Sequence, residues 1–399
     1  MNQRVPQSKA MNKKRVLHCI QQESPISRAG IAAKIHLSKP TVSHLVDELL
    51  QENKVYEKGI GPSSSQGGRK PIHLYFNARA AYVIGTDIGG TKVKTILSDL
   101  NGTIIHTKSF STASHLRTGL LEQLSKDVSS MLAAEGIDVT DVLGMGIGVP
   151  GITKNGIVID APSLDWVRYP IQSEAERHFP FPVYVENDVN VAVLGEQWIG
   201  NARNKKHVLF IAVGTGIGSG IIIHDQLYRG ATHASGEVGY MVTDRRDLEG
   251  DFQPIFHRYG YLESVAGGKA IGATFTRSVV LDPAHPAHQA AMAGELSGEL
   301  AFRYASEGDA AAMAIVDDAI TQLGYGIINA ASVLNPEVII LGGGVLKSAD
   351  YILPKLERMV NEYLPIPVEL KVSELGSNVG VIGAVSLFLR EHEGTGHLL

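Results

Sequence analysis

Cysteine is almost absent from this sequence of 399 residues, which contains only Cys19. A single thiol cannot form a disulfide within the chain, and it cannot build a zinc site from several cysteines. Long apolar segments are also missing, because no run approaches the roughly 18 residues that a membrane helix requires. The N-terminus is polar and basic rather than signal-like. We therefore expect a cytoplasmic protein with no membrane partner.

The charge of the chain is small in total but unevenly distributed. The net charge is −5, yet residues 1–79 carry +8 and the residues after them carry −13. A basic segment ahead of an acidic body is typical of a nucleic-acid-binding module attached to a soluble sensor or enzyme. A solvated basic tail is the alternative that charge alone leaves open.

The basic segment is predicted to contain three helices. Residues 12–22 place their apolar side chains on one helical face, and Ser27 is suited to cap a second helix. A third helix is expected from Ser38 onward, with Pro40 in its first turn, where a missing N–H costs nothing. The buried stripe of that helix is expected to comprise Val42, Leu45, Val46, Leu49 and Leu50.

Two short helices followed by a polar-faced third helix form a helix-turn-helix pattern. The third helix is predicted to enter the major groove of DNA, with Thr41, Ser43 and His44 at base edges and Lys39 on a phosphate. The same pattern also occurs in purely structural helix bundles, so the helices alone leave both interpretations open.

The segment after these helices favours the DNA interpretation. Residues 54–57 and 72–76 are strand-like, and the stretch between them is rich in Gly, Ser and Pro. This pattern predicts a β-wing. At its tip, Arg69 and Lys70 are expected to reach into a narrow minor groove.

Beyond residue 77 the sequence consists of apolar strands separated by glycine turns. GTDIGGTKVKTILSD at residues 85–99 and VLFIAVGTGIGSGIII at residues 208–223 both predict β-turn-β hairpins. A glycine turn lets backbone N–H groups approach phosphates, and Thr91 or Thr215 adds a hydroxyl donor. Two such hairpins far apart in the sequence indicate two similar α/β lobes that face a cleft for a nucleotide and a sugar.

The motifs DIGGTK, GVPG, END, GTGIGSG, GEVGY, GYLES and LGGG occur in this order. Together they resemble the ROK family of repressors and sugar kinases over nearly the whole chain, and the N-terminal part resembles its xylose-repressor and N-acetylglucosamine-repressor branch. The resemblance implies an α/β fold, with a winged helix-turn-helix at 1–79 ahead of a two-lobed, actin-like sugar-kinase body. The implied small lobe is 80–194, completed by a helix in 377–399, and the large lobe is 195–376.

The resemblance also implies two sets of binding residues. Asp188 of END is placed where family kinases hold the base that deprotonates the sugar hydroxyl. The implied sugar contacts are Asn187, Asp188, Glu237, Glu263, Tyr240 and Ser163, with Asp165 beside Ser163. The implied nucleotide contacts are Asp87, Gly89, Gly90, Thr91, Lys92, Gly214, Thr215, Gly216 and Gly343. Each of the sugar positions has a structural alternative, such as a turn cap or a surface carboxylate.

The structural zinc site of the family is not expected in this chain. Tyr240 stands at the position of the zinc-binding histidine, and Pro254, Phe256 and Tyr261 stand at the positions of the three cysteines. No thiolate ligand is left to bind the metal. We expect Tyr240 and Tyr261 to pack together or through Phe256 instead, and we expect no metal.

Two functions of different classes fit these features. The first is a sugar-responsive transcriptional regulator, a repressor in most relatives, which binds a two-fold operator as a homodimer or homotetramer. The second is an ATP-dependent sugar kinase, since both glycine hairpins and Asp188 are retained. We predict the regulator, with a sugar between the lobes and no required cofactor; Mg–ATP enters only if the chain is also a kinase. The sequence does not decide among xylose, glucose, N-acetylglucosamine and a sugar phosphate.

Overall fold

The computed structural model describes residues 4–60, 72–115, 119–244 and 260–392. Contacts divide the chain into two compact units. The first unit contains Met1–Ile147, Ile171–Val185 and Ala384–Leu399, and the second contains Gly148–Pro170 and Glu186–Gly383. The domain boundaries predicted at residues 79, 194 and 376 stay a prediction.

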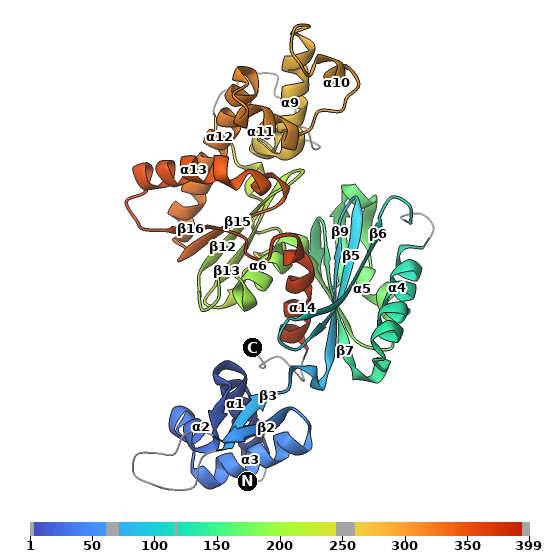
Figure 1. Ribbon diagram of the computed structural model, residues 1–399, viewed down its shortest axis with the longest axis vertical. Coiled ribbons are helices and arrows are strands. Elements are labelled where there is room, and N and C mark those ends of the chain that lie inside the picture. Colours follow the sequence, from blue (N-terminus) through green and yellow to red (C-terminus); the bar gives the residue numbers. More distant parts are fainter. Residues whose placement is uncertain (1–3, 61–71, 116–118, 245–259, 393–399) are drawn as a thin grey trace. The chain divides into compact units, whose positions relative to one another are not determined.

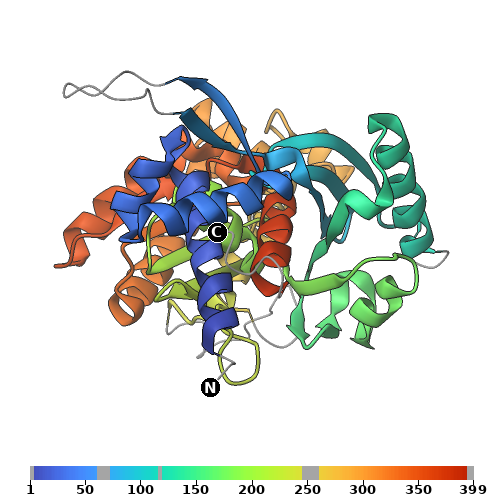
Figure 2. The ribbon, with the colours of Figure 1, turned by 90° about the horizontal axis from the view of Figure 1, so that it is seen from below.

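The first segment of the chain is a three-helix domain with a small sheet. Its elements are α1 (Arg4–Glu23), β1 (Ile26–Ser27), α2 (Arg28–Ile35), α3 (Lys39–Gln51), β2 (Val55–Ile60) and β3 (Ile72–Phe76). The strands pair in the order β1-β3-β2, and Figure 2 shows β2 and β3 as an antiparallel ribbon. The predicted cap is confirmed, because Ser27 Oγ accepts from Gly30 N–H at 3.1 Å. Ser38, predicted as the first residue of the third helix, is the N-cap of α3, and its Oγ accepts from Thr41 N–H at 3.3 Å.

A five-stranded sheet follows this domain (Figure 1). Its strands are β4 (Tyr82–Ile88), β5 (Lys92–Asp99), β6 (Ile104–Ser111), β7 (Val142–Val149) and β11 (Val183–Asn187), in the order β11-β7-β4-β5-β6. The first predicted hairpin is confirmed, since β4 and β5 pair antiparallel from Tyr82↔Asp99 to Ile88↔Val93. Helix α4 (Leu120–Glu135) covers β5 and β6, and α5 (Ile171–Glu176) precedes β11.

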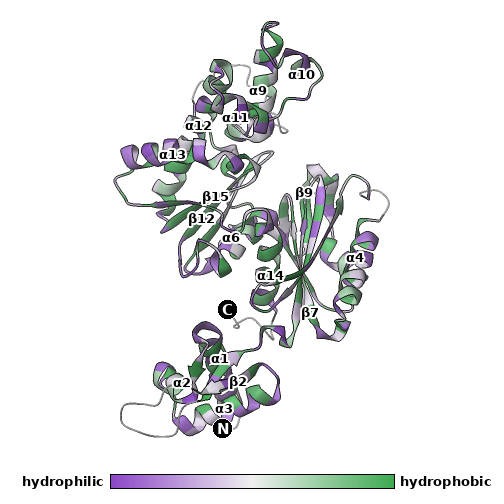
Figure 3. Ribbon diagram, viewed as in Figure 1, coloured by the Kyte–Doolittle hydropathy of each residue, from purple (hydrophilic) through white to green (hydrophobic). Residues whose placement is uncertain are grey.

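Helix α14 (Val379–Glu391) approaches β7 very closely. A Cβ on Gly146 of β7 would lie 1.8 Å from the carbonyl oxygen of Ala384, and a Cβ on Gly144 would lie 2.2 Å from the Phe388 ring. Two glycines in one strand therefore create the space into which the helix fits. Figure 3 shows β7 as mainly hydrophobic, as expected for a strand under a helix.

A second five-stranded sheet repeats the topology of the first. Its strands are β12 (Val208–Val213), β13 (Ile217–Ile223), β14 (Gln226–Leu227), β15 (Val338–Gly342) and β16 (Glu369–Val372), in the order β14-β13-β12-β15-β16. In both sheets the first strand is central, the next two extend one side as antiparallel hairpins, and the last two extend the other side. Two lobes of the same topology were predicted from the two glycine hairpins, and the repeated strand order confirms them.

The described part of the second unit also contains several helices. They are α6 (Asp188–Ile199), α8 (Glu263–Ala266), α9 (Gly268–Val280), α10 (His288–Met292), α11 (Gly298–Ser306), α12 (Ala310–Leu334) and α13 (Ala349–Tyr363). Helix α12 supplies Val316, Ile320, Leu323 and Ile327 to the hydrophobic core. Among the described residues it is the one helix long and apolar enough to cross a membrane, and half of its apolar window is buried. A core helix passes the same test, so α12 is weak evidence for a membrane span.

Glycine is also required where α14 begins its second turn. A Cβ on Gly383 would lie 1.8 Å from the carbonyl oxygen of Val191 in α6, and a backbone atom cannot move aside as a side chain can. We expect Gly383→Ala to lower the free energy of unfolding by about 3 kcal/mol, as overpacking does. Gly344→Ala is the control, since no atom lies within 4 Å of its Cβ position. Urea unfolding tests this, and equal stability of both variants would contradict the packing described.

Candidate functional site

The exposed face of α3 carries most of the side chains predicted to read DNA. Lys39, Thr41 and His44 are exposed, while Ser43 is half-buried and its carbonyl oxygen accepts from Arg28 Nη1 at 3.2 Å. Ser43 therefore differs from the prediction that it faces outward. The opposite face packs inward through Val42, Leu45, Val46 and Leu49, all fully buried, whereas Leu50 is half-buried.

The wing is built on an antiparallel strand pair. Val55 lies opposite Phe76 and Ile60 lies opposite Ile72, with an irregularity between Glu57 and Ile60. Tyr56 and Tyr75 stack across the pair with ring centroids 5.4 Å apart. Arg69 and Lys70, the predicted minor-groove residues, lie outside the described residues.

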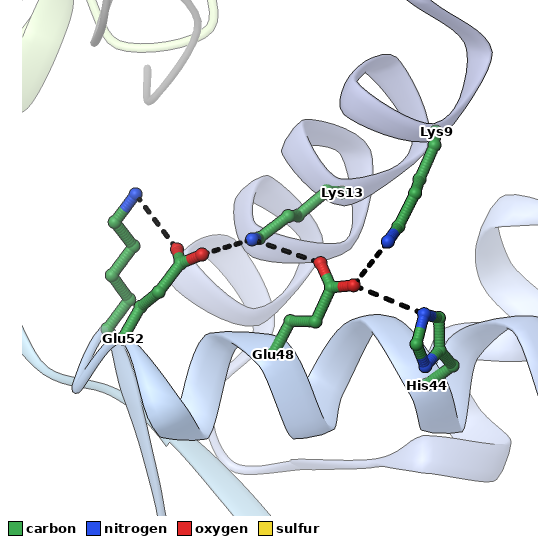
Figure 4. Close-up of polar contacts among 6 residues, drawn as sticks. Lys9, Lys13, His44, Glu48 and Glu52 are labelled. Atoms are coloured by element: carbon green, nitrogen blue, oxygen red, sulfur yellow. Dashed lines mark hydrogen bonds and ion pairs between the residues drawn. The ribbon is translucent and has the colours of Figure 1, made fainter. Parts of the chain in front are cut away.

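Ion pairs join α3 to α1 (Figure 4). The Glu48 carboxylate of α3 lies 2.5 Å from Lys9 Nζ and 3.1 Å from Lys13 Nζ, both on α1, and Lys13 also contacts Glu52. Hydrogen bonds from Lys9 and then Lys13 lower the pKa of Glu48 to about 2. His44 Nε2 lies 3.1 Å from the same carboxylate. A predicted DNA-reading side chain thus touches a carboxylate that stays ionised at any physiological pH.

The other flank of α3 is joined to α2 in a similar way. Arg28 at the start of α2 contacts Asp47 at 2.7 Å and Glu57 of β2 at 3.0 Å. The acidic residues in the C-terminal half of α3 are therefore paired with cations of neighbouring elements. Only the N-terminal half of α3 presents a surface free of carboxylates.

In the second unit, Asn187 and Asp188 lie where β11 passes into α6. Asn187 Oδ1 accepts from the N–H groups of Val189 and Asn190, each at 3.0 Å, and so caps the helix. Its Nδ2 donates to Gly151 O at 3.1 Å and to Asp188 Oδ1 at 3.0 Å. A sugar that contacts the Asn187 amide must therefore replace one of these bonds. Asp188 Oδ1 also accepts from Val189 N–H at 2.9 Å, at the positive end of the helix dipole.

Glu186, next to these residues, is a buried carboxylate whose ion pair with the partly exposed Arg229 could not be predicted from the sequence. Its side chain is only 5% exposed, and its Oε2 lies 2.5 Å from Arg229 Nε. Its Oε1 accepts from Asn187 N–H at 2.9 Å and from Asn190 Nδ2 at 3.1 Å. Arg229 therefore connects the loop that leads to Glu237 with the start of α6.

Glu237, Glu263 and Tyr240 lie close enough to influence one another electrostatically. Burial raises the pKa of Glu237, and the charge of Glu263 raises it further. Burial also raises the pKa of Tyr240, with added contributions from Glu237, Glu263 and Asp160. Carboxylates gathered in this way suit the hydroxyl groups of a sugar, because each oxygen can accept a hydrogen bond.

The backbone around Glu263 leaves little room for larger residues. A Cβ on Gly239 would lie 2.4 Å from Ile217 O, and a Cβ on Gly260, whose φ is +98°, would lie 2.3 Å from Glu263 Oε1. Glu263 Oε2 is 3.4 Å from Ile217 N. Glycine is therefore required at both positions, by the Ile217 carbonyl at Gly239 and by the positive φ and the Glu263 side chain at Gly260.

Ser163 and Asp165 lie between β9 (Ile157–Ala161) and β10 (Trp166–Tyr169). These strands and β8 (Ile152–Lys154) form an antiparallel sheet in the second unit. Both side chains are exposed, and Asp165 adopts a left-handed conformation with φ +54°. The segment that carries these two residues also carries Asp160, whose charge acts on Tyr240.

The expected replacement for the zinc site can be described only in part. Tyr240 is 49% exposed, so its ring is not fully covered by apolar side chains. The Leu262 N–H donates to Met241 O at 3.1 Å and joins the two segments through the backbone. Pro254 and Phe256 lie outside the described residues. Among the described residues, no group of three His, Cys, Asp or Glu side chains is arranged for a metal ion.

The first glycine turn, Gly89 to Lys92, joins β4 to β5. Gly89 N–H donates to Lys92 O at 2.9 Å, and Gly90, Thr91 and Lys92 are exposed. Asp87, at the end of β4, is half-buried. Burial raises the pKa of Asp87 to about 6, against the opposing effect of Lys94.

The second glycine turn lies in the other sheet. Gly214 N–H donates to Gly216 O at 3.0 Å, and Thr215 is exposed. Because β12 and β15 are parallel neighbours, this turn and Gly343 follow the same edge of the sheet. Gly343 has φ +94°, and a Cβ there would lie 2.5 Å from Val213 O. No atom lies within 4 Å of the Cβ position of Gly214, so the backbone is open enough to approach a phosphate.

The raised pKa of Asp87 predicts a pH-dependent stability. The folded chain holds this proton more tightly than the unfolded chain, so ionisation destabilises the fold: the penalty is absent below about pH 4 and complete above about pH 6. We expect Asp87→Asn to be more stable than the natural chain by about 3 kcal/mol at pH 7.5 and equal at pH 4.

Denaturant unfolding at the two pH values measures this difference. Asp138→Asn is the control with the opposite sign, because hydrogen bonds from Thr140 N–H and its hydroxyl lower the pKa of Asp138. That variant is expected to lose stability at neutral pH. If the free energy of unfolding differs by the same amount at both pH values, ionisation of Asp87 does not destabilise the fold.

Comparisons with known proteins identify the family of the chain and the class of its N-terminal domain. The model of the ROK family matches residues 83–391, and a model of winged helix-turn-helix DNA-binding domains matches residues 12–56. The xylose repressor of Bacillus spizizenii is 32% identical over 393 residues, which cover 96% of each chain.

Two solved structures resemble the chain. A ROK family transcriptional regulator, described as a homolog of the E. coli MLC protein, superposes with a TM-score of 0.78 at 24% identity and covers 95% of this chain and 96% of its own. A ROK family glucokinase from Streptomyces griseus, in complex with glucose and AMPPNP, has a TM-score of 0.64 at 28% identity and covers 77% of this chain and 99% of its own. Because the family model spans most of the sequence and the relative matches it nearly end to end, the chain belongs to the ROK family.

Proposed function

We propose that this chain is a sugar-responsive DNA-binding repressor of carbohydrate-utilisation genes. The observation that carries the proposal is the exposed N-terminal half of α3, beside a paired wing and ahead of a ROK body with clustered carboxylates. Kinases of the family that match here cover only the body, whereas a repressor matches the head as well. A DNA-binding head has no use in a sugar kinase that acts alone.

DNA is bound by the head, which corresponds to residues 1–79 in the proposed organisation. Lys39 contacts a phosphate, Thr41 and His44 contact base edges, and Arg69 and Lys70 follow the minor groove. A two-fold operator is read by a homodimer or homotetramer in the cytoplasm, with the half-site spacing set by the assembly.

The sugar binds at the carboxylate cluster of the second unit. Asp188, Glu237 and Glu263 accept from sugar hydroxyls, with Tyr240, Asn187 and Ser163 at the same site. Xylose is the first candidate, because the similar repressor from Bacillus spizizenii is named for it. The sugar can weaken DNA binding only if it binds one conformational state of the protein more tightly than another.

An ATP-dependent sugar kinase is the second candidate. Asp188, at the start of α6, is the proposed base for a sugar hydroxyl, and Gly214 of the second glycine turn has the open backbone that phosphates need. Asp87, Gly89–Lys92, Gly214–Gly216 and Gly343 are the proposed contacts of Mg–ATP. The glucokinase bound to AMPPNP supports this alternative for the body alone.

A titration of the purified chain against the DNA upstream of its own gene tests the proposal. It is repeated with xylose, glucose, N-acetylglucosamine and their phosphates, each with and without Mg–ATP. We expect one sugar to weaken DNA binding without ATP. Sugar phosphorylation combined with no specific DNA complex would instead establish the kinase.

A further inference from the structure

The Glu48 carboxylate of α3 faces α1 and touches three basic side chains (Figure 4). Its Oε1 is 2.5 Å from Lys9 Nζ and 3.1 Å from His44 Nε2, and its Oε2 is 3.1 Å from Lys13 Nζ. The Glu48 side chain is 22% exposed, whereas that of His44 is 66% exposed. A carboxylate held on both oxygens therefore contacts a side chain that faces solvent.

We propose that Glu48 is a positioning residue that decides which atom of His44 reads the DNA, an inference that rests on the proposed repressor function. We take His44 as the neutral tautomer with its proton on Nε2, which lies 3.1 Å from Glu48 Oε1, so Nδ1 is the ring nitrogen left for a base. In a neutral imidazole the second nitrogen is a hydrogen-bond acceptor. In the major groove an acceptor selects an amino group, which only adenine N6 and cytosine N4 provide.

The charges around α3 make His44 the last base-reading residue along the helix. Asp47 and Glu48 follow it, and carboxylates there repel phosphates unless they are neutralised. Arg28 of α2 contacts Asp47, and the lysines of α1 contact Glu48. The neutralised C-terminal half of α3 can lie near the DNA backbone, while base contacts stay in the first two turns.

Glu52 provides a matched control one turn further along. It contacts Lys13, as Glu48 does, and Lys54 at 3.4 Å. Glu52 is the C-cap residue of α3, and substituting it removes the same charge next to the same lysine. Among the described residues Glu52 contacts Lys13 and Lys54 but not His44. A Glu48 substitution therefore removes a contact of the imidazole, and a Glu52 substitution does not.

The test measures binding of the full-length chain to a footprinted operator by fluorescence anisotropy. Every base pair of one half-site is replaced in turn, and the variants are His44→Ala, Glu48→Ala, Glu48→Gln, Glu52→Ala and the double variant His44→Ala/Glu48→Ala. We expect the natural chain to lose about ten-fold in affinity when one adenine or cytosine is replaced.

The expected pattern across variants is specific to one base pair. His44→Ala and Glu48→Ala lose the discrimination at that same pair, and the double variant loses no more than either. Glu48→Gln keeps most of it, because the amide oxygen still accepts from Nε2–H. Glu52→Ala keeps all of it.

Three outcomes overturn the inference: Glu48→Ala keeps the discrimination, the selected base carries no amino group in the major groove, or Glu48→Ala weakens all sequences equally with a lowered melting temperature. The last outcome assigns Glu48 a structural role alone. A natural chain that forms no specific complex refutes the proposed repressor function itself, and the inference with it.

Discussion

A full-length chain in which Lys39, Thr41 and His44 are all alanine is expected to bind its operator at least about a hundred-fold more weakly. Base contacts contribute about 1–3 kcal/mol of discrimination each, and Lys39 adds a phosphate contact. All three side chains are exposed, so their loss leaves the packing of α3 unchanged. Anisotropy titrations with operator and with scrambled DNA measure the loss.

Sugar binding by the same variant is the internal control. In isothermal titration calorimetry the triple variant should bind the sugar with the same affinity as the natural chain, because the carboxylate cluster lies in the second unit. A variant with Lys126 and Ser129 of α4 changed to alanine controls for the loss of exposed polar groups. Removal of residues 1–79 should abolish operator binding altogether. Unchanged operator affinity of the triple variant would show that α3 is not the recognition helix.

Replacing Arg229 by methionine is expected to lower the free energy of unfolding by about 3 kcal/mol and to abolish the sugar response. The change leaves the Glu186 carboxylate buried without its cation, which is the costly way to break a buried ion pair. Glu186 also holds Asn187 N–H and Asn190 Nδ2, so its displacement disturbs the start of α6 and with it Asp188.

Two further variants separate the loss of stability from the loss of sugar binding. Arg229→Lys keeps the charge and should retain part of the response. Glu186→Gln combined with Arg229→Met removes both charges and should recover much of the stability while sugar affinity stays low. Calorimetry with the effector sugar and urea unfolding measure the two quantities. Normal sugar affinity in Arg229→Met would mean that the ion pair serves stability only.

The head could be predicted from sequence because its signals are local. Ser27 and Ser38 precede apolar helical patterns; Ser27 caps its helix as expected, and Ser38 marks the start of the next helix as its cap. Strand β1 was missed because two residues are too few to show an alternating pattern. Its existence depends on pairing with β3, Ile26 opposite Leu74, which no local pattern indicates.

The long-range contacts of the candidate site could not be predicted in the same way. Glu186 and Arg229 are far apart in the chain, and neither stands in a pattern that names its partner. Asn187 was predicted as a sugar contact from its motif, but its amide is already used to cap α6 and to hold Gly151 O. Nothing in the sequence distinguishes Glu48 from other surface carboxylates, because its contacts with Lys9 and Lys13 exist only where α1 packs against α3.

The most direct test of the account is the affinity of the chain for its effector sugar, measured once without DNA and once saturated with operator. Linkage requires that DNA weaken sugar binding by the same factor by which sugar weakens DNA binding. We predict equal factors from the two titrations, at least about five-fold. An affinity for the sugar that is the same with and without operator would contradict a sensor that couples the two sites.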